Sequence, residues 1–316
     1  MINKKVSGIS GKVFSYILRY VFFLSLSYIL VYPLIYIFVN SLKDLSNAYD
    51  ATVNWVPKYL YFGNLLDAIK VFDLKHTALR SFVYEILASL IQFCSCAVAA
   101  YGLARFDLKG KSLMSILMIV NILVPSMMII IPSYVNFSQM DFMGILGLIS
   151  RITGKDIRPN LIGTPLVFYL PALLGVGLKG GLFVYIYSQF FKGLPKELEE
   201  AAWIDGAGAW KTFLKIVIPS SSSAIITVLL FSVVWYWNDY YLAQMYMSEP
   251  TFSVAIYNFS SYSITDKLGL SVETARYLNV PMILSGCVWF ISPMLLFYLA
   301  MQRRFMASVA TSGIVG

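Results

Sequence analysis

The residues best suited to catalysis or metal binding are few in this chain and lie far apart in the sequence. The single histidine, His76, is expected to be a solvated loop residue rather than a metal ligand or a general base. The three cysteines, Cys94, Cys96 and Cys287, fall in apolar stretches without zinc spacing or a disulfide framework, which indicates packing residues. No H-E-x-x-H or G-x-S-x-G motif occurs. The sequence therefore predicts no catalytic residue, no metal site and no bound cofactor.

A phosphate-binding loop is suggested by Gly110-Lys111-Ser112 and excluded by the residues before it. Such a loop needs a glycine five positions before its second glycine, so that backbone amides can surround a phosphate. Here that position holds Arg105, and the segment joins two long apolar runs. We interpret it as a basic turn, and the sequence predicts no nucleotide-binding site on this chain.

Three charged residues lie in or near apolar stretches, where a charge is costly and therefore informative. Glu85 is expected near a hydrated end of its stretch. Lys179 either faces a water-filled cavity or marks the true beginning of a helix, and the glycines around it favour the second interpretation. Asp239, which follows Trp237 and Asn238, either bonds a neighbouring helix or forms part of a polar wall, and the sequence does not decide between these roles.

Composition places the chain in a membrane. Of its 316 residues, 59% are hydrophobic and 13% are charged, whereas about a quarter of a soluble domain is charged. The 22 Phe, 22 Tyr and 6 Trp suit lipid contact and interfacial belts. The net charge of +8 is explained by basic residues that hold cytoplasmic loops in place, so we expect contact with lipid and no nucleic-acid partner.

Six stretches are long and apolar enough to cross a bilayer, which takes about 20 residues of helix. We therefore expect an all-α polytopic protein of the plasma or inner membrane with six transmembrane helices. The fourth stretch is less regular, because a proline, several glycines and a lysine interrupt it. The predicted spans are residues 20–39, 82–104, 113–134, 166–191, 224–242 and 280–301.

Lysine and arginine side chains are concentrated on the side of the membrane that holds both chain ends, which predicts cytoplasmic termini. The first span is too long for a signal peptide and no small-residue cleavage site follows it, so we interpret it as an uncleaved anchor. The predicted organisation is a cytoplasmic N-terminal segment over 1–19, a six-span domain over 20–301 with a cytoplasmic loop at 192–219, and a cytoplasmic tail over 302–316.

Two outer loops differ in their predicted structure. The segment GNLLDAIKVFDL at 63–74 is predicted to be an amphipathic helix on the surface of the bundle. Its apolar face would hold Leu65, Ile69 and Phe72. The segment 136–164 is polar and rich in glycine, and there we expect a loop with little regular structure.

Residues 194–219 read LPKELEEAAWIDGAGAWKTFLKIVIP and predict a helix–turn–helix outside the membrane. Pro195 suits the first position of a helix, and the glutamates after it favour the positive end of the helix dipole. Gly206 and Gly208 can end that helix and allow a second one to begin near Ala209.

The spacing within this segment is similar to a loop of the inner-membrane permeases of ABC importers. That loop reads Glu-Ala-Ala, three residues, Gly, nine residues, Ile, one residue, Leu-Pro. Here Glu200-Ala201-Ala202 is followed at the same spacings by Gly206 and Ile216, and Ile218 replaces the usual leucine before Pro219. The resemblance implies that the loop docks on an ATPase and moves with it as a lever. The implied coupling residues are Glu200, Ala201, Ala202, Asp205, Gly206 and Gly208.

Other segments resemble the carbohydrate-importing branch of that family, and in particular the partner-permease type of the maltose importer. They are AAYGLARFDLKGK at 99–111, VPSMMIIIP at 124–132, Asp205 before Gly206, Trp237-Asn238-Asp239, and Gln302-Arg303-Arg304 near the end. The tail departs from the family pattern, because residues 313–316 lack the lysine that is common before the last glycine.

The resemblance implies a type I ABC importer transmembrane domain that forms half of a translocation path for a carbohydrate, most simply an oligosaccharide. The implied partners are a second permease subunit, two cytoplasmic ATPase subunits and an extracellular or periplasmic solute-binding protein. Trp237, Asn238 and Asp239 are the candidate residues of the solute path, since sugars are bound by Asn and Asp hydrogen bonds and by aromatic faces.

Two alternatives stay open. The cargo can instead be a peptide, phosphate or a polyamine, because importers of these solutes share the loop. A secondary transporter or channel is the alternative from another class. It predicts charged pairs or ion sites in mid-span, and it gives the 200–219 loop no role.

Overall fold

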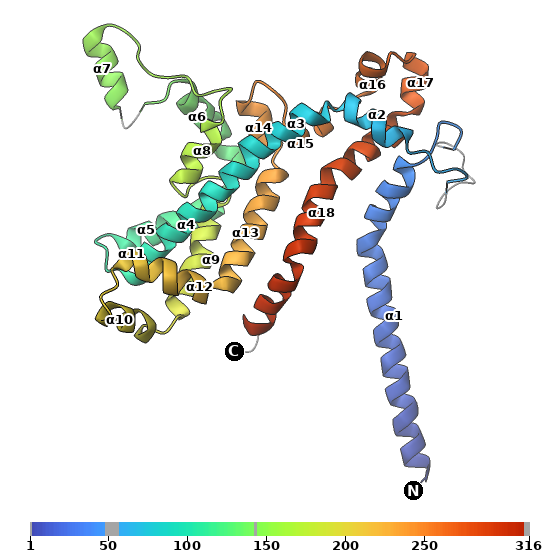
Figure 1. The fold of residues 1–316 in the computed structure, drawn as a ribbon, viewed down its shortest axis with the longest axis horizontal. Coiled ribbons are helices and arrows are strands. Elements are labelled where there is room, and N and C mark those ends of the chain that lie inside the picture. The colour runs from blue at the N-terminus through green and yellow to red at the C-terminus, as the bar shows by residue number, and fades with distance from the viewer. Residues whose placement is uncertain (1, 48–56, 142–143, 313–316) are drawn as a thin grey trace. The chain divides into compact units, whose positions relative to one another are not determined.

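The computed structural model describes residues 2–47, 57–141 and 144–312, which contain helices and no strand. This agrees with the predicted all-α fold. The chain divides into two compact units that are each built from two stretches of sequence (Figure 1). The first unit joins the residues up to Phe72 with Phe259–Trp289, and the second joins Asp73–Asn258 with the residues from Phe290 onward.

The first unit begins with a long helix that crosses the predicted boundary at residue 19 without a break. Asn64 connects the residues after this helix to the next one, because its side-chain amide donates to the carbonyl oxygens of Ser41 at 3.0 Å and Lys43 at 2.7 Å. The Trp289 indole N–H donates to the Leu65 carbonyl at 2.9 Å. The helices of this unit are α1 (Ile2–Ser41), α2 (Gly63–Val71), α16 (Ser261–Leu268), α17 (Val272–Tyr277) and the beginning of α18 (Asn279–Ser312).

The predicted helix in segment 63–74 exists as α2, but its buried face is not the predicted one. Its buried residues are Asn64, Ala68 and Val71, whereas Leu65 and Ile69 are only half-buried. The difference has a physical reason: the Asn64 amide must face the carbonyls that it bonds, and this rotates the helix so that small residues lie inside. Phe72, just after the helix, is buried as expected.

The second unit packs around α4, which lies against α8, α9 and α13. Two clusters of buried side chains form its interior. One is centred on Phe183, Tyr187 and Phe213, and the other on Phe168 and Tyr236. Its helices are α3 (Leu74–Ser81), the π-helical turn η1 (Phe82–Ile86), α4 (Leu87–Arg105), α5 (Lys111–Leu123), α6 (Ser126–Ser138), α7 (Ile145–Thr153), α8 (Leu166–Leu173), α9 (Gly180–Gly193), α10 (Glu197–Ile204), α11 (Ala209–Thr212), the π-helical turn η2 (Phe213–Val217), α12 (Ile218–Ser220), α13 (Ser222–Trp237), α14 (Tyr241–Tyr246), α15 (Phe252–Tyr257) and the rest of α18.

Three helices of the described chain are long and apolar enough to cross a membrane, and there are five such spans if each of two bent pairs counts as one. The bent pairs are α5 with α6, which meet at 106°, and Ala209–Ser220 with α13, which meet at 84°. The predicted fourth span is instead two short helices, α8 and α9, on either side of residues 174–179. Left-handed backbone at Gly175 and Lys179 interrupts the helix there. The three long helices are Phe14–Ser41, Leu74–Arg105 and Asn279–Met306.

The segment 136–164 is more regular than its composition predicts, because it contains helix α7. Glycines in the left-handed conformation bound the helix at Gly144 and Gly154. The Asp141 carboxylate accepts the backbone N–H groups of Leu146 at 2.9 Å and Gly147 at 3.1 Å. The expectation of a loop was therefore wrong: the glycines and the aspartate that indicate a loop are the residues that end and cap a short helix.

Two further expectations are corrected by the structure. Glu85 lies in η1 and is fully buried rather than at a hydrated end. His76 lies in α3 rather than in a loop. Its exposed ring nitrogen Nδ1 is 2.8 Å from the Asp73 carboxylate, and the two residues are three apart on the chain.

Candidate functional site

The loop with the family spacing folds as two short helices joined by a glycine turn. The backbone N–H of Gly206 donates to the Trp203 carbonyl at 3.0 Å, and that of Ala207 donates to the Ala202 carbonyl at 2.9 Å. This pair of bonds is a Schellman motif, and its central residue, Gly206, has φ +77°. Gly208 is extended, with φ −73°, and precedes α11. Helix α10 begins two residues after Pro195 rather than at it.

The two faces of α10 differ in burial. Glu199 and Ala202, three residues apart, are buried against the rest of the second unit, with 3% and 8% of their surface exposed. Glu200 and Ala201 are exposed, as are Asp205, Gly206 and Gly208. The two adjacent alanines of the loop therefore do not share one environment. Ala201 faces outward, and Ala202 packs inside the subunit.

A buried ion pair attaches α10 to the end of α4. Nε of Arg105 lies 2.5 Å from Oε1 of Glu199, and both side chains are more than nine-tenths buried. The Tyr101 hydroxyl donates to the other carboxylate oxygen, Oε2, at 3.1 Å. Nη2 of Arg105 also donates to the Leu194 carbonyl at 2.9 Å. Sequence reasoning missed Arg105 and Glu199 as partners, although both lie in quoted motifs, because 94 residues separate them.

The outward side of the helix–turn–helix carries large apolar side chains that nothing in the described chain covers. Exposed apolar side chains outside the long apolar helices are candidates for contact with a partner. The surface is outside the long apolar helices and follows α9 directly. Its members and their exposed fractions are Leu198 at 45%, Trp203 at 48%, Ile204 at 86%, Trp210 at 60% and Leu214 at 51%.

Trp237, Asn238 and Asp239 end α13, and each has protein contacts. The buried Trp237 ring stacks on Phe290 at 5.5 Å, and its indole N–H donates to the Phe290 carbonyl at 3.1 Å. The Asp239 carboxylate accepts the N–H groups of Leu242 at 3.3 Å and Ala243 at 3.2 Å, which caps α14. Asn238 is exposed and lines a small groove. Their role in a solute path stays a prediction.

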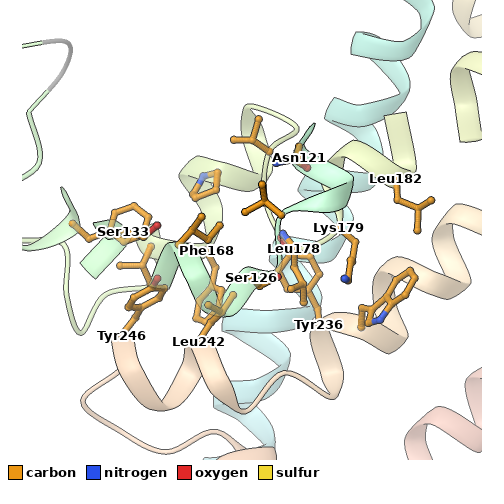
Figure 2. Close-up of a pocket in the computed structure, with 18 of the residues that line it drawn as sticks. Asn121, Ser126, Ser133, Phe168, Leu178, Lys179, Leu182, Tyr236, Leu242 and Tyr246 are labelled. Carbon is orange, nitrogen blue, oxygen red and sulfur yellow. The ribbon is translucent and has the colours of Figure 1, made fainter. Parts of the chain in front are cut away.

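A larger pocket of about 510 Å³ lies elsewhere in the second unit, where two helices are interrupted (Figure 2). One interruption separates α5 from α6, and the other separates α8 from α9. The lining mixes aromatic rings with hydroxyl and amide groups, and Lys179 is its only charged residue. The residues that line it include Asn121, Ser126, Ser133, Phe137, Phe168, Lys179, Trp235, Tyr236 and Tyr246.

The pocket was not found from the sequence, although two signals were present. VPSMMIIIP and GVGLKGG interrupt apolar stretches with proline and glycine, and such broken helices border binding sites in membrane transporters. Lys179 was predicted either to face a cavity or to mark the beginning of a helix, and both descriptions apply in the structure. Helix α9 begins directly after it, and its side chain lines a cavity.

Gln92 of α4 holds the wall of this pocket in place. Its side-chain amide donates to the Leu178 carbonyl at 2.7 Å, and its oxygen accepts the Tyr236 hydroxyl at 2.5 Å. The Leu178 N–H in turn lies 3.3 Å from the Tyr236 oxygen. These bonds join α4, the segment between α8 and α9, and α13. Because Gln92 is fully buried, each of its bonds compensates for lost hydration.

Within the described residues, no group of three or more His, Cys, Asp or Glu side chains is placed to hold a metal ion. Fold and site together describe a multi-pass helical membrane protein with an exposed helix–turn–helix and a polar pocket between broken helices. The model of the family "Binding-protein-dependent transport system inner membrane component" matches residues 96–310. The chain belongs to this family, whose members are transporter components rather than enzymes.

Individual relatives and a solved structure are similar over most of the chain. The diacetylchitobiose uptake system permease protein NgcG of Streptomyces coelicolor is 25% identical, over 90% of this chain and 84% of the relative. The trehalose transport system permease protein SugB of Mycobacterium tuberculosis is 26% identical, over 90% and 92%. The crystal structure of a bacterial ABC transporter involved in the import of the acidic polysaccharide alginate contains a chain with a TM-score of 0.68 and 18% identity, over 94% of this chain and 98% of that one. The fold is therefore that of a type I ABC importer transmembrane domain.

Proposed function

We propose that this chain is one of two permease subunits in an importer, that it forms half of the path for a carbohydrate, and that separate ATPase subunits drive it through the α10–α11 loop. One observation carries the proposal. The loop exposes large apolar side chains, while its inner side is attached to α4 by the buried pair of Arg105 and Glu199. A surface that docks a partner and passes on its movement requires both properties.

Helix α4 is the element that connects the docked loop to the pocket. Arg105 at its end contacts α10, and Gln92, 13 residues earlier, bonds Leu178 and Tyr236 in the pocket wall. At 1.5 Å per residue the two positions are about 20 Å apart along the helix. A displacement of α10 by an ATPase would therefore move α4 and, through Gln92, the wall of the pocket.

The chemistry of the pocket suits a carbohydrate. Its hydroxyl and amide groups can bond sugar hydroxyls, and rings such as Phe137, Trp235 and Tyr246 can pack against the C–H faces of a sugar. The relatives named for diacetylchitobiose and trehalose uptake support the same class of cargo. Trp237, Asn238 and Asp239 are proposed to continue this path beyond α13.

The proposed topology puts the α10–α11 loop, the segment 1–19 and the tail 302–316 in the cytoplasm. The asymmetry of lysine and arginine between the two sides supports it. The proposed partners are a second permease, two ATPase subunits on the cytoplasmic side, and an extracellular or periplasmic solute-binding protein. The dependence of the family on a binding protein supports the last of these.

The experiment is isolation of the complex through an affinity tag on this chain, followed by reconstitution in proteoliposomes with the binding protein. We expect ATPase subunits to copurify and labelled oligosaccharides to accumulate with ATP but not with a non-hydrolysable analogue. Accumulation of peptides, phosphate or polyamines in place of sugars would reassign the cargo. Solute accumulation that follows an ion gradient without ATP would instead support a secondary transporter.

A further inference from the structure

Lys179 stands out from the rest of the pocket by its charge. The other lining residues include no Asp, Glu, Arg or His. Among the described residues, no acidic side chain forms an ion pair with Lys179, and its Nζ atom lies 5.9 Å from the centre of the Trp235 ring. A ring face attracts a cation but leaves its charge unneutralised. In a membrane domain, such a cation is tolerated where it faces a water-filled cavity, and it marks a substrate pathway.

The backbone at this position favours a glycine, yet the residue is a lysine. Lys179 has φ +60° and ψ +21°, in the left-handed region that glycine adopts freely. At the neighbouring positions 180 and 181, glycine is required because there is no room for a side chain. A Cβ at Gly180 would collide with the Gly175 carbonyl, and one at Gly181 would lie 2.9 Å from the Met118 carbonyl. A glycine at position 179 would relieve the strain of the left-handed backbone, yet the residue is a lysine. This indicates that the lysine side chain has a function.

The neighbouring polar groups in the pocket also favour a negatively charged ligand. The Gly181 N–H donates to Oδ1 of Asn121 at 2.9 Å, so the amide nitrogen of Asn121 is the atom left to donate. The Tyr236 hydroxyl donates its hydrogen to Gln92, and the Tyr236 oxygen accepts the backbone N–H of Leu178. The lining of the cavity therefore includes an ammonium group and an amide donor. Figure 2 shows Asn121, Lys179 and Tyr236 around the same part of the pocket.

We propose that this pocket binds an acidic sugar residue, with the Lys179 ammonium group paired to a carboxylate of the transported carbohydrate. The proposal rests on the proposed function and narrows its substrate class to uronate-containing oligosaccharides. Lys179 is then a specificity-determining residue, since an ion pair inside a cavity that holds no other charge distinguishes an acid from its neutral counterpart.

The test compares an oligogalacturonate with its carboxyl-reduced counterpart, in which each carboxylate is replaced by a neutral CH2OH group. Equilibrium binding of each is measured on the whole complex in nanodiscs without the solute-binding protein, so that the pocket alone selects. We expect the acidic sugar to bind at least about tenfold more tightly, equivalent to about 1.4 kcal/mol. Lys179→Met should remove this preference, Lys179→Arg should keep most of it, and Lys155→Met, in an exposed loop, should bind like the wild type.

Lys179→Gly separates a loss of binding from a loss of folding, because it relieves the left-handed strain at this position. It should lose the preference while its thermal unfolding midpoint stays equal to or above that of the wild type. Equal binding of the two sugars by the wild type, or an unchanged preference in Lys179→Met and Lys179→Gly, would overturn the inference. Neither outcome affects the proposed function, which ATP-dependent uptake of oligosaccharides, whether acidic or neutral, tests separately.

Discussion

The Arg105 guanidinium and the Glu199 carboxylate meet 2.5 Å apart in the interior of the second unit, where they join the end of α4 to the first turn of α10. Tyr101 bonds the same carboxylate, and its ring packs 4.8 Å from that of Phe213 in η2. Three segments of the chain, α4, α10 and η2, therefore meet around this buried ion pair. An element that must transmit movement from a docked partner needs such a rigid attachment.

Removal of one partner of this pair should uncouple the transporter. Glu199→Gln leaves the Arg105 charge buried without its counter-charge, at a cost of about 3–5 kcal/mol. We expect uptake to fall at least tenfold while the complex still assembles. ATPase activity and uptake are measured on the same preparation. Glu197→Gln, at an exposed position on the same helix, is the control and should transport normally. Normal uptake by Glu199→Gln would mean that the pair only stabilises the subunit.

The loop surface predicts opposite outcomes for its two alanines. Ala201→Trp changes the exposed face, so we expect normal amounts of the subunit in the membrane but loss of ATPase binding and of uptake. Ala202→Trp overpacks an interior position, at about 1–3 kcal/mol, and should lower the amount of folded subunit. Copurification of the ATPase and subunit levels on immunoblots are measured for both. ATPase binding by Ala201→Trp at the wild-type level would exclude this face as the docking surface.

Gly206 should resist substitution, whereas Gly208 should tolerate it. At φ +77° any residue with a side chain is strained, by about 1–2 kcal/mol for a left-handed backbone, so Gly206→Val should abolish uptake by disturbing the turn. Gly208 has an ordinary φ of −73° and open space around it, so Gly208→Ala is the matched control. Uptake assays compare the two variants. Equal activity would show that the turn geometry is not needed for coupling.

Asp239 allows a direct comparison of its two candidate roles. Asp239→Asn keeps an oxygen that can cap α14, whereas Asp239→Ala removes the cap at about 0.5–2 kcal/mol. If Asp239 lines the solute path, the asparagine variant should assemble and hydrolyse ATP yet transport poorly. Full uptake by the asparagine variant together with a lower melting temperature of the alanine variant would leave capping as its role.

The proposed topology predicts which introduced cysteines a membrane-impermeant thiol reagent can reach in intact cells. In a background without the three native cysteines, Lys58→Cys should be labelled, and Lys211→Cys and Ser312→Cys should react only after the cells are opened. The measurement is mass shift by gel after exposure to a polyethylene-glycol maleimide. Labelling of Lys211→Cys in intact cells would invert the topology.

Sequence alone determined the features that depend on local chemistry. Apolar runs predict membrane helices because a bilayer leaves few alternatives, and three predicted spans coincide with helices of the required length: Phe14–Ser41, Leu74–Arg105 and Asn279–Met306. The turn after α10 was predictable because a left-handed helix end favours glycine, and Gly206 has that conformation.

Only the tertiary structure decided which residues meet and which side of a helix lies inside. Glu199 and Arg105, and likewise Gln92 and Tyr236, are far apart in sequence, and no spacing rule connects them. Ala201 and Ala202 are identical residues at adjacent positions, so their opposite burial depends on how α10 packs. The sequence shows that Lys179 is a charged residue in an apolar stretch. The cavity that it lines exists only because the interruption between α5 and α6 packs near the one between α8 and α9. Long-range packing sets these contacts, and local patterns do not encode it.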